Sequence, residues 1–303
     1  MSLNRRQFLT HTMHGFSGVA LAAMLAEEAH GESPKIDPAK PYTPRPTHFA
    51  PKAKRVIEVF CSGALSHVDT FDYKPELIRR HGQPLPGNEK LVSFQGPNGN
   101  LTQPLWTFRP RGQCEKMVSD LVPHIGALAD EICFLHSLTN KSNTHGPAEN
   151  VMNTGFAFDG FPSMGAWVSY GLGSENRDLP GYVVFITGNV AGAGNSLWGS
   201  GFLPTLHQGI EFRSSGEPVL FLSNPKGVSG KDRREIVDGI NFLNRQSLAD
   251  VGDPEIATRI AQYELAFRMQ TSVPELMDTS KESKAVHTLY GTQPGKASFA
   301  NNC

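Results

Sequence analysis

The stretch RVIEVFCSGALSHVDTFDYKPEL, residues 55–77, decides the predicted fold. Its first six residues, 55–60, are mainly β-branched and apolar, which is typical of a buried strand. A loop dense in serine, histidine and aspartate follows. Comparable apolar runs at 132–138, at 182–187 and, more weakly, at 218–223 predict three further strands.

Helical spacing occurs between these runs. Apolar residues three or four apart predict a helix over 113–130, and Pro147 marks a favoured first position of another. A short helix is predicted within 162–173, and two helices are predicted over 232–277, divided at Pro254. Because strands alternate with helices, the sequence predicts an α/β fold with a mainly parallel sheet.

The amino-acid composition narrows the classes of function that this protein can have. The 303 residues include 28 basic and 29 acidic side chains, so no basic surplus indicates a nucleic-acid partner. With 30 glycines and 22 prolines, the chain has the long loops of an enzyme with much of its site on loops. The four cysteines form no Cys-x-x-Cys pair, which excludes zinc-knuckle and thioredoxin spacing, and the sequence assigns no disulfide.

The N-terminal region indicates export. Residues 1–31 contain Arg5-Arg6 followed by Phe8-Leu9 and a weakly apolar, small-residue stretch, which resembles a twin-arginine signal; the alternative is an amphipathic helix. The apolar part is too short and polar for a stable membrane span. Residues 32–52 are predicted to be a Pro-rich linker, and 53–303 the domain. We therefore expect a periplasmic or secreted protein whose partner is the twin-arginine export machinery. Such proteins are often exported already folded with a metal bound.

Two loops leave the carboxyl ends of predicted strands, where α/β sheets bind their ligands. In the loop 61–75, Asp69 and Asp72 offer carboxylates and His67 an imidazole, which are ligands that metals use. The alternative is that the aspartates only cap turns. These three residues are the predicted metal ligands.

The loop 139–147 carries Thr144 and His145. His145 could be a metal ligand, a proton-transfer group or a nucleophile, or simply a hydrogen-bonded loop histidine. Core or turn roles suffice for His124 and His136. The glycine-rich stretch 188–209 is expected to cover or line something, and its Gly-x-Gly falls short of a nucleotide-binding fingerprint.

Several motifs together resemble the DUF1501 family of exported bacterial proteins, which are similar to distant members of the alkaline phosphatase and sulfatase superfamily. They are SGALSHVDTFDYKPEL (62–77), THGPAENVMNTG (144–155), PSMGAWVSYGLGSEN (162–176), LPGYVVF (179–185) and TLYG (288–291). The resemblance implies an alkaline phosphatase-like fold, a mainly parallel sheet between helices, with divalent metal ions, zinc or calcium, at the carboxyl ends of the strands.

The chain departs from that superfamily at the reacting position. By the spacing to Thr154-Gly155, His145 stands where sulfatases have a modified cysteine and phosphatases a serine or threonine. Thr144 or Ser142 could then be the hydroxyl nucleophile. The chain has Cys61-Ser62-Gly63 where the superfamily has a metal-binding aspartate, so Asp69 or Asp72 would replace it.

The resemblance also implies that the fold is incomplete at the C-terminus, because family members continue with further ligand-bearing segments beyond SFANNC (298–303). The expected function is an exported metal-dependent hydrolase of phosphate or sulfate esters, acting on a small-molecule or glycan ester. The alternatives are a non-catalytic exported binding protein on the same fold and an inactive fragment. The sequence leaves open whether the protein is an enzyme.

Overall fold

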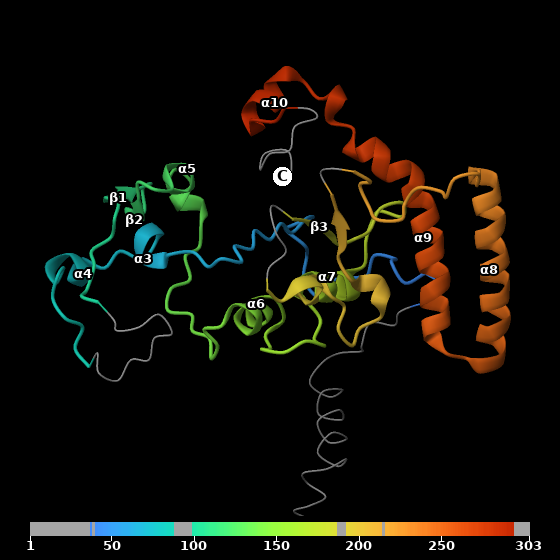
Figure 1. Ribbon diagram of the computed structural model, residues 1–303, viewed down its shortest axis with the longest axis horizontal. Helices are drawn as coiled ribbons and strands as arrows, with labels where there is room; N and C mark the ends of the chain where they lie inside the picture. Colours follow the sequence, from blue (N-terminus) through green and yellow to red (C-terminus); the bar gives the residue numbers. More distant parts are fainter. Residues whose placement is uncertain (1–36, 38–39, 88–98, 187–191, 214–215, 294–303) are drawn as a thin grey trace, which may run out of the picture. The chain divides into compact units, whose positions relative to one another are not determined.

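The computed structural model describes residues 37, 40–87, 99–186, 192–213 and 216–293 (Figure 1). The predicted export signal, residues 1–31, lies outside the described residues. The chain divides into two compact units. Unit 1 comprises Met1–Arg55 and Glu149–Cys303, and unit 2 comprises Val56–Ala148.

Unit 2 consists of short elements. Its helical elements are α3 (His67–Thr70), α4 (Pro75–Arg79), α5 (Pro123–Gly126) and the 3-10 turn η2 (Ala129–Glu131), and its strands are β1 (Phe108–Arg111) and β2 (Lys116–Ser119). The strands pair antiparallel with Phe108 opposite Ser119. The Asp130 carboxylate closes their turn by accepting hydrogen bonds from the backbone nitrogens of Gln113 and Cys114, both at 2.8 Å. A side chain at Gly112 would lie 2.5 Å from the same carboxylate, which explains the glycine in the turn.

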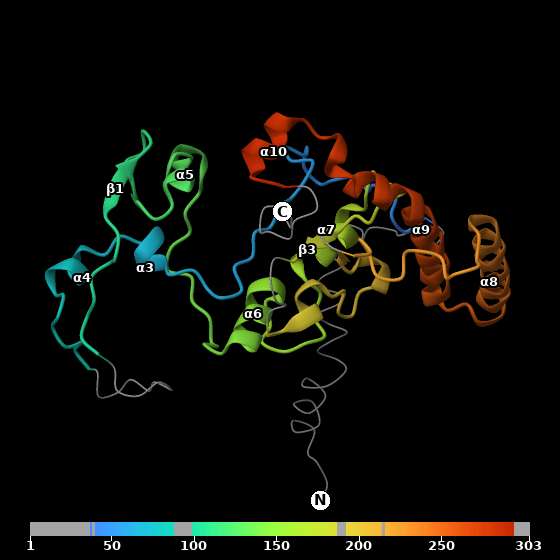
Figure 2. The same cartoon turned by 45° about the horizontal axis from the view of Figure 1, so that its top comes forward.

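Unit 1 is built around a two-stranded parallel sheet and two long helices (Figure 2). Strand β3 (Val183–Phe185) pairs with β4 (Ile210–Phe212). Around them lie α6 (His145–Thr154, which begins in unit 2), α7 (Met164–Leu172) and the 3-10 turns η3 (Gly194–Trp198) and η4 (Thr205–His207). The core cluster joins β4 to the long helix α9 (Pro254–Met277); it contains Phe212, Leu222, Leu265, Met269 and Val273.

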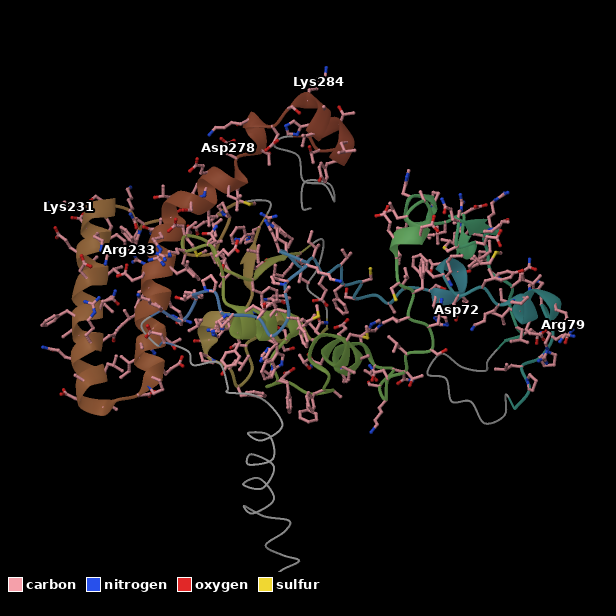
Figure 3. The ribbon with its side chains drawn as sticks, turned by 180° about the vertical axis from the view of Figure 1, so that it is seen from behind. Asp72, Arg79, Lys231, Arg233, Asp278 and Lys284 are labelled. Carbon is pink, nitrogen blue, oxygen red and sulfur yellow. The ribbon has the colours of Figure 1, made fainter. Side chains whose placement is uncertain are left out.

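The two long helices form a hairpin, followed by η5 (Thr279–Lys281) and α10 (Lys284–Tyr290). Helix α8 (Gly230–Val251) ends at Gly252, whose φ of 74° is left-handed, and Pro254 begins α9. Figure 3 shows α8 and α9 side by side, with Lys231 and Arg233 near the start of α8. Between the helices, Arg234 binds both carboxylate oxygens of Glu264, at 2.9 and 2.7 Å. This bidentate pair fixes the register of the hairpin.

Ser229 caps α8. Its hydroxyl accepts a hydrogen bond from the Asp232 backbone nitrogen at 3.2 Å, and the Asp232 carboxylate accepts one from the Ser229 nitrogen at 2.8 Å. Replacing Ser229 with alanine should lower the free energy of unfolding by about 1 kcal/mol, because the Asp232 N–H in the first turn of α8 loses its acceptor. Urea unfolding measures this, with Ser247→Ala at an exposed position of α8 as control. Equal losses in the two variants would contradict a capping role.

Residues 40–45 pack on α7, within the segment predicted to be a linker. The Arg45 nitrogen donates to the Leu172 carbonyl at 3.0 Å, and the Ser174 nitrogen donates to the Tyr42 carbonyl at 2.8 Å. Gly173 lies between these contacts with a φ of 73°, and a side chain there would come within 2.3 Å of the Thr43 carbonyl oxygen. A glycine at the end of α7 therefore lets the N-terminal segment approach closely.

The structure confirms several predicted elements. Strand β3 lies within 182–187, whose last residue is outside the described part. Helix α6 begins two residues before Pro147, α7 lies within 162–173, and α8 and α9 divide at Pro254. The mixed helical and strand content is also confirmed. The described residues form two sheets of two strands each, one antiparallel and one parallel, rather than one mainly parallel sheet.

Four predicted elements are wrong. Residues 55–60, 132–138 and 218–223 form no strand, and the predicted helix 113–130 contains β2, α5 and η2. In the first run Ile57 is 87% exposed and in the second Leu138 is 78% exposed. An apolar run identifies residues suited to a sheet, but a strand also needs a neighbouring backbone, and the runs have no ladder partner among the described residues.

Among the residues that the structure describes, no helix has the length and apolar character needed to cross a bilayer.

Candidate functional site

The Asp69 carboxylate is held on both sides. Its Oδ2 accepts a hydrogen bond from the Ser66 hydroxyl at 2.7 Å, and its Oδ1 accepts one from the Leu105 backbone nitrogen at 3.1 Å. Thr70, which is buried, closes the same turn by donating to the Ser66 carbonyl at 2.8 Å. Asp69 therefore ties the loop before β1 to α3, which favours the turn-stabilising alternative for this residue.

Asp72 follows α3 and is the electrostatic centre of the region (Figure 3). Lys74 Nζ lies 2.9 Å from its Oδ2, and His136 Nδ1 lies 3.9 Å from its Oδ1. The hydrogen bond from Lys74, followed by the charges of Lys74, His136 and His67, holds the pKa of Asp72 below its usual range. The carboxylate is therefore ionised at neutral pH and attracts cations.

His136 joins this group from the segment after η2. Its Nε2 lies 2.7 Å from Lys116 Nζ on β2, and its ring stacks on Phe134 with a centroid distance of 6.3 Å. The imidazole thus lies between the ammonium of Lys116 and the carboxylate of Asp72. A carboxylate next to an imidazole is the arrangement that supports many metal ligands.

The donor types of this cluster fit zinc better than calcium. His67, Asp72 and His136 offer two imidazoles and one carboxylate, whereas calcium takes six to eight oxygens. The placement of these side chains suits a zinc ion less well, because the ammonium groups of Lys74 and Lys116 already contact the Asp72 carboxylate and the His136 imidazole. Across the described ranges, no group of three or more histidine, cysteine or acidic side chains is arranged to hold a metal ion.

Thr144 and His145 lie at the start of α6. The Thr144 carbonyl accepts from the Ala148 nitrogen at 2.9 Å, and His145 is the first helical residue. Both side chains are exposed. The free N–H groups and the dipole of a helix N-terminus favour negative charge, so the two residues lie in a setting that suits an anion.

Buried polar residues anchor the rest of α6 to the glycine-rich stretch. The Ala193 nitrogen donates to Glu149 Oε2 at 3.0 Å, and the Ser196 hydroxyl donates to Asn150 Oδ1 at 2.9 Å. Asn150 Nδ2 in turn donates to Asp159 at 2.8 Å. The described part of the stretch 188–209 therefore packs against α6, within unit 1, and its first residues, 188–191, lie outside the described part.

The structure thus brings His67 and Asp72 together, gives Asp69 a supporting position beside them, and places Thr144 and His145 on a separate element. Sequence reasoning missed His136, Lys74 and Lys116. His136 was given a core or turn role, but it is exposed. His136 interrupts the apolar run ICFLHSL, and this interruption is the sequence signal that could have identified it as a site residue.

Comparison with known proteins gives one match. The family model of a protein of unknown function, DUF1501, matches residues 53–303. No curated protein and no solved structure matches the chain. Since the family model covers most of the chain, including α3, Asp72, His136 and the start of α6, this protein belongs to the DUF1501 family.

Proposed function

We propose that this protein is an exported metal-dependent hydrolase of phosphate or sulfate esters, carried to the periplasm or outside the cell by the signal proposed for residues 1–31. One observation carries the proposal: the ionised carboxylate of Asp72 lies next to the imidazole of His136, and the charge of His67 acts on it. Carboxylate and imidazole groups on exposed turns are the groups with which hydrolases hold a catalytic metal ion.

In this proposal His67, Asp72 and His136 would hold a divalent ion, zinc by donor type, in an arrangement that the described residues do not already form, and Asp69 fixes the turn that carries two of them. When bound, the ion activates a nucleophile and neutralises charge on the ester group. Lys74 and Lys116 release their partners and bind the ester oxyanion, since both are ammonium groups next to the site. Thr144 or His145 acts at the reacting centre, where the N-terminus of α6 favours developing negative charge.

An alkaline phosphatase-like sheet belongs to the same proposal. Its support is the order of the sequence motifs at 62–77, 144–155, 162–176, 179–185 and 288–291. The runs 55–60 and 132–138 give it no support, because they form no strand in the structure.

A second function is a non-catalytic exported binding protein for sulfated or phosphorylated glycans. The specific observation in its favour is that the ammonium groups of Lys74 and Lys116 already contact Asp72 and His136 respectively. A cluster with two ammonium groups can bind an oxyanion directly, without a metal ion.

Asp72→Asn distinguishes the two functions. If the protein is a metal hydrolase, we expect kcat/KM for 4-nitrophenyl phosphate or 4-nitrophenyl sulfate, measured with added zinc, to fall more than about 100-fold, because the variant lacks the central anionic ligand. Zinc content, measured by elemental analysis, should fall with it. Asp120→Asn is the matched control, since Asp120 also lies in unit 2 and pairs with Arg109 and Arg111.

Folded wild-type protein that binds no zinc and hydrolyses neither ester would overturn the hydrolase proposal. Binding of phosphate or sulfate under those conditions, lost in Lys74→Gln with Lys116→Gln, would establish the binding protein instead. Similar losses of activity in Asp72→Asn and Asp120→Asn would move the site away from Asp72.

A further inference from the structure

Unit 1 contains a cavity of about 1070 Å³ that shares no residue with the proposed hydrolase site. Four parts of unit 1 line it: Asp37 and residues 40–44 of the N-terminal segment, the turn 174–178 after α7, the end of α8 and one face of α9. Its volume lies just above the usual range for pockets that bind small organic ligands.

The walls of the cavity are largely apolar. Pro41, Tyr42 and Pro44 line it from the N-terminal segment, and Leu248 and Ile260 line it from the helix hairpin. The Tyr42 hydroxyl has no hydrogen-bond partner in the part of the chain that the structure describes. Burial raises the pKa of Tyr42 to about 12, against the opposing charge of Arg268, so the hydroxyl stays protonated and can donate to a ligand.

The charged groups that line the cavity are unequally paired. Arg268 is paired with Asp178 at 3.3 Å, and Glu264 is bound by Arg234 on α8. The side chains of Lys40, Arg177 and Arg245 make no hydrogen bond or ion pair with any residue that the structure describes. The remaining lining carboxylates are Asp37 and Glu175, so four basic and four acidic side chains line the cavity in total, and three of the basic ones make no such pair.

We propose that this cavity binds an organic anion with an apolar or aromatic body and one acidic group, either a carboxylate or a sulfate- or phosphate-type oxyanion. The apolar body lies between the rings of the N-terminal segment and α9. The acidic group is held by Arg177 and Arg245, whose guanidinium groups suit bidentate binding of such anions, and by the Tyr42 hydroxyl. The proposal does not depend on hydrolysis at Asp72.

Calorimetric titration of the full chain tests this with four probes that cannot be hydrolysed: naphthalene-2-sulfonate, 2-naphthylphosphonate, 2-naphthoate and the neutral 2-naphthylmethanol. At least one anionic probe should bind, at least about ten-fold more tightly than the neutral one, and more weakly at high salt. Which of the three binds best identifies the acidic group. The double variant Arg177→Gln with Arg245→Gln should weaken the preferred probe about ten-fold or more.

Arg259→Gln is the matched control, because Arg259 is an exposed arginine of α9 that does not line the cavity. It should leave binding unchanged, and so should Asp72→Asn, which affects only the hydrolase site. The proposal is overturned if no anionic probe binds the folded chain or if the neutral probe binds equally well. Equal weakening by Arg259→Gln and the double variant would also overturn it, since it would show attraction to surface charge alone.

Discussion

Replacing Phe212 with alanine is expected to lower the free energy of unfolding of unit 1 by about 3–5 kcal/mol. Phe212 is the last residue of β4, is 2% exposed, and belongs to the core cluster with Leu265, Met269 and Val273. Removing its ring leaves a cavity between the small sheet and α9, and the two-stranded sheet offers little other apolar surface to fill it.

The opposite residue of the sheet provides a matched control. Phe185 pairs with Phe212 in register but is 53% exposed, so Phe185→Ala should cost much less. Urea unfolding followed by tryptophan fluorescence measures both. A Trp106→Phe background leaves only Trp167 and Trp198, both in unit 1, so that the signal reports that unit. Equal losses in the two phenylalanine variants would show that β4 does not hold α9 in place.

Acidification is expected to cause the second large loss of stability, through protonation of His207. His207 is 1% exposed, its Nδ1 lies 3.0 Å from the Ser169 hydroxyl, and its Nε2 is buried without a partner in the described structure. Burial, and secondly the charge of Arg45, lowers the pKa of His207 from 6.5 to about 4. The rings of Tyr42 and Tyr170 pack against the imidazole and supply no counter-charge.

The pKa shift fixes the sign of the pH dependence. The unfolded chain binds a proton at His207 below pH 6.5, whereas the folded chain does so only near pH 4. The free energy of unfolding is therefore unaffected by this group above pH 6.5 and falls as the pH drops from 6.5 to 4, by about 3 kcal/mol in total.

Thermal unfolding from pH 7 to pH 4 measures the slope. His207→Gln cannot take up the proton, so its loss of stability over that window should be smaller than that of the wild type, whatever its stability at pH 7. His48→Gln, at an exposed position of unit 1, should keep the wild-type slope. Parallel slopes for all three proteins would show that His207 is not the responsible group.

Local signals in the sequence predicted the helices best. Ser163 and Gly173 bound α7, and Asp253-Pro254 separates the long helices, because capping and turn preferences act over only a few residues. The strand predictions were poorer, since pairing depends on which backbone comes alongside. The run 182–187 finds β4 as a partner, whereas the similar run 55–60 finds none among the described residues.

The same distinction applies to the candidate site. Asp72 and His67 lie in one short loop, so the sequence could group them. His136 is distant in the sequence and Lys116 lies on a strand that was predicted to be helical, so their approach to Asp72 depends on tertiary packing. The opposite roles of Asp69 and Asp72, one holding the turn and one facing cations, follow from hydrogen-bond partners that a sequence does not show.

The docking of residues 40–45 on α7 has a consequence for the order of events during synthesis. Arg45 and its partner Tyr170 are 125 residues apart, and all of unit 2 is made between them. Unit 2 is continuous in sequence and its contacts can form as it leaves the ribosome, while the first part of unit 1 waits for α7 and α9. Closing so long a loop costs chain entropy and raises the contact order. We therefore expect the slowest folding phase of the chain to be the joining of residues 40–45 to α7 and the long helices.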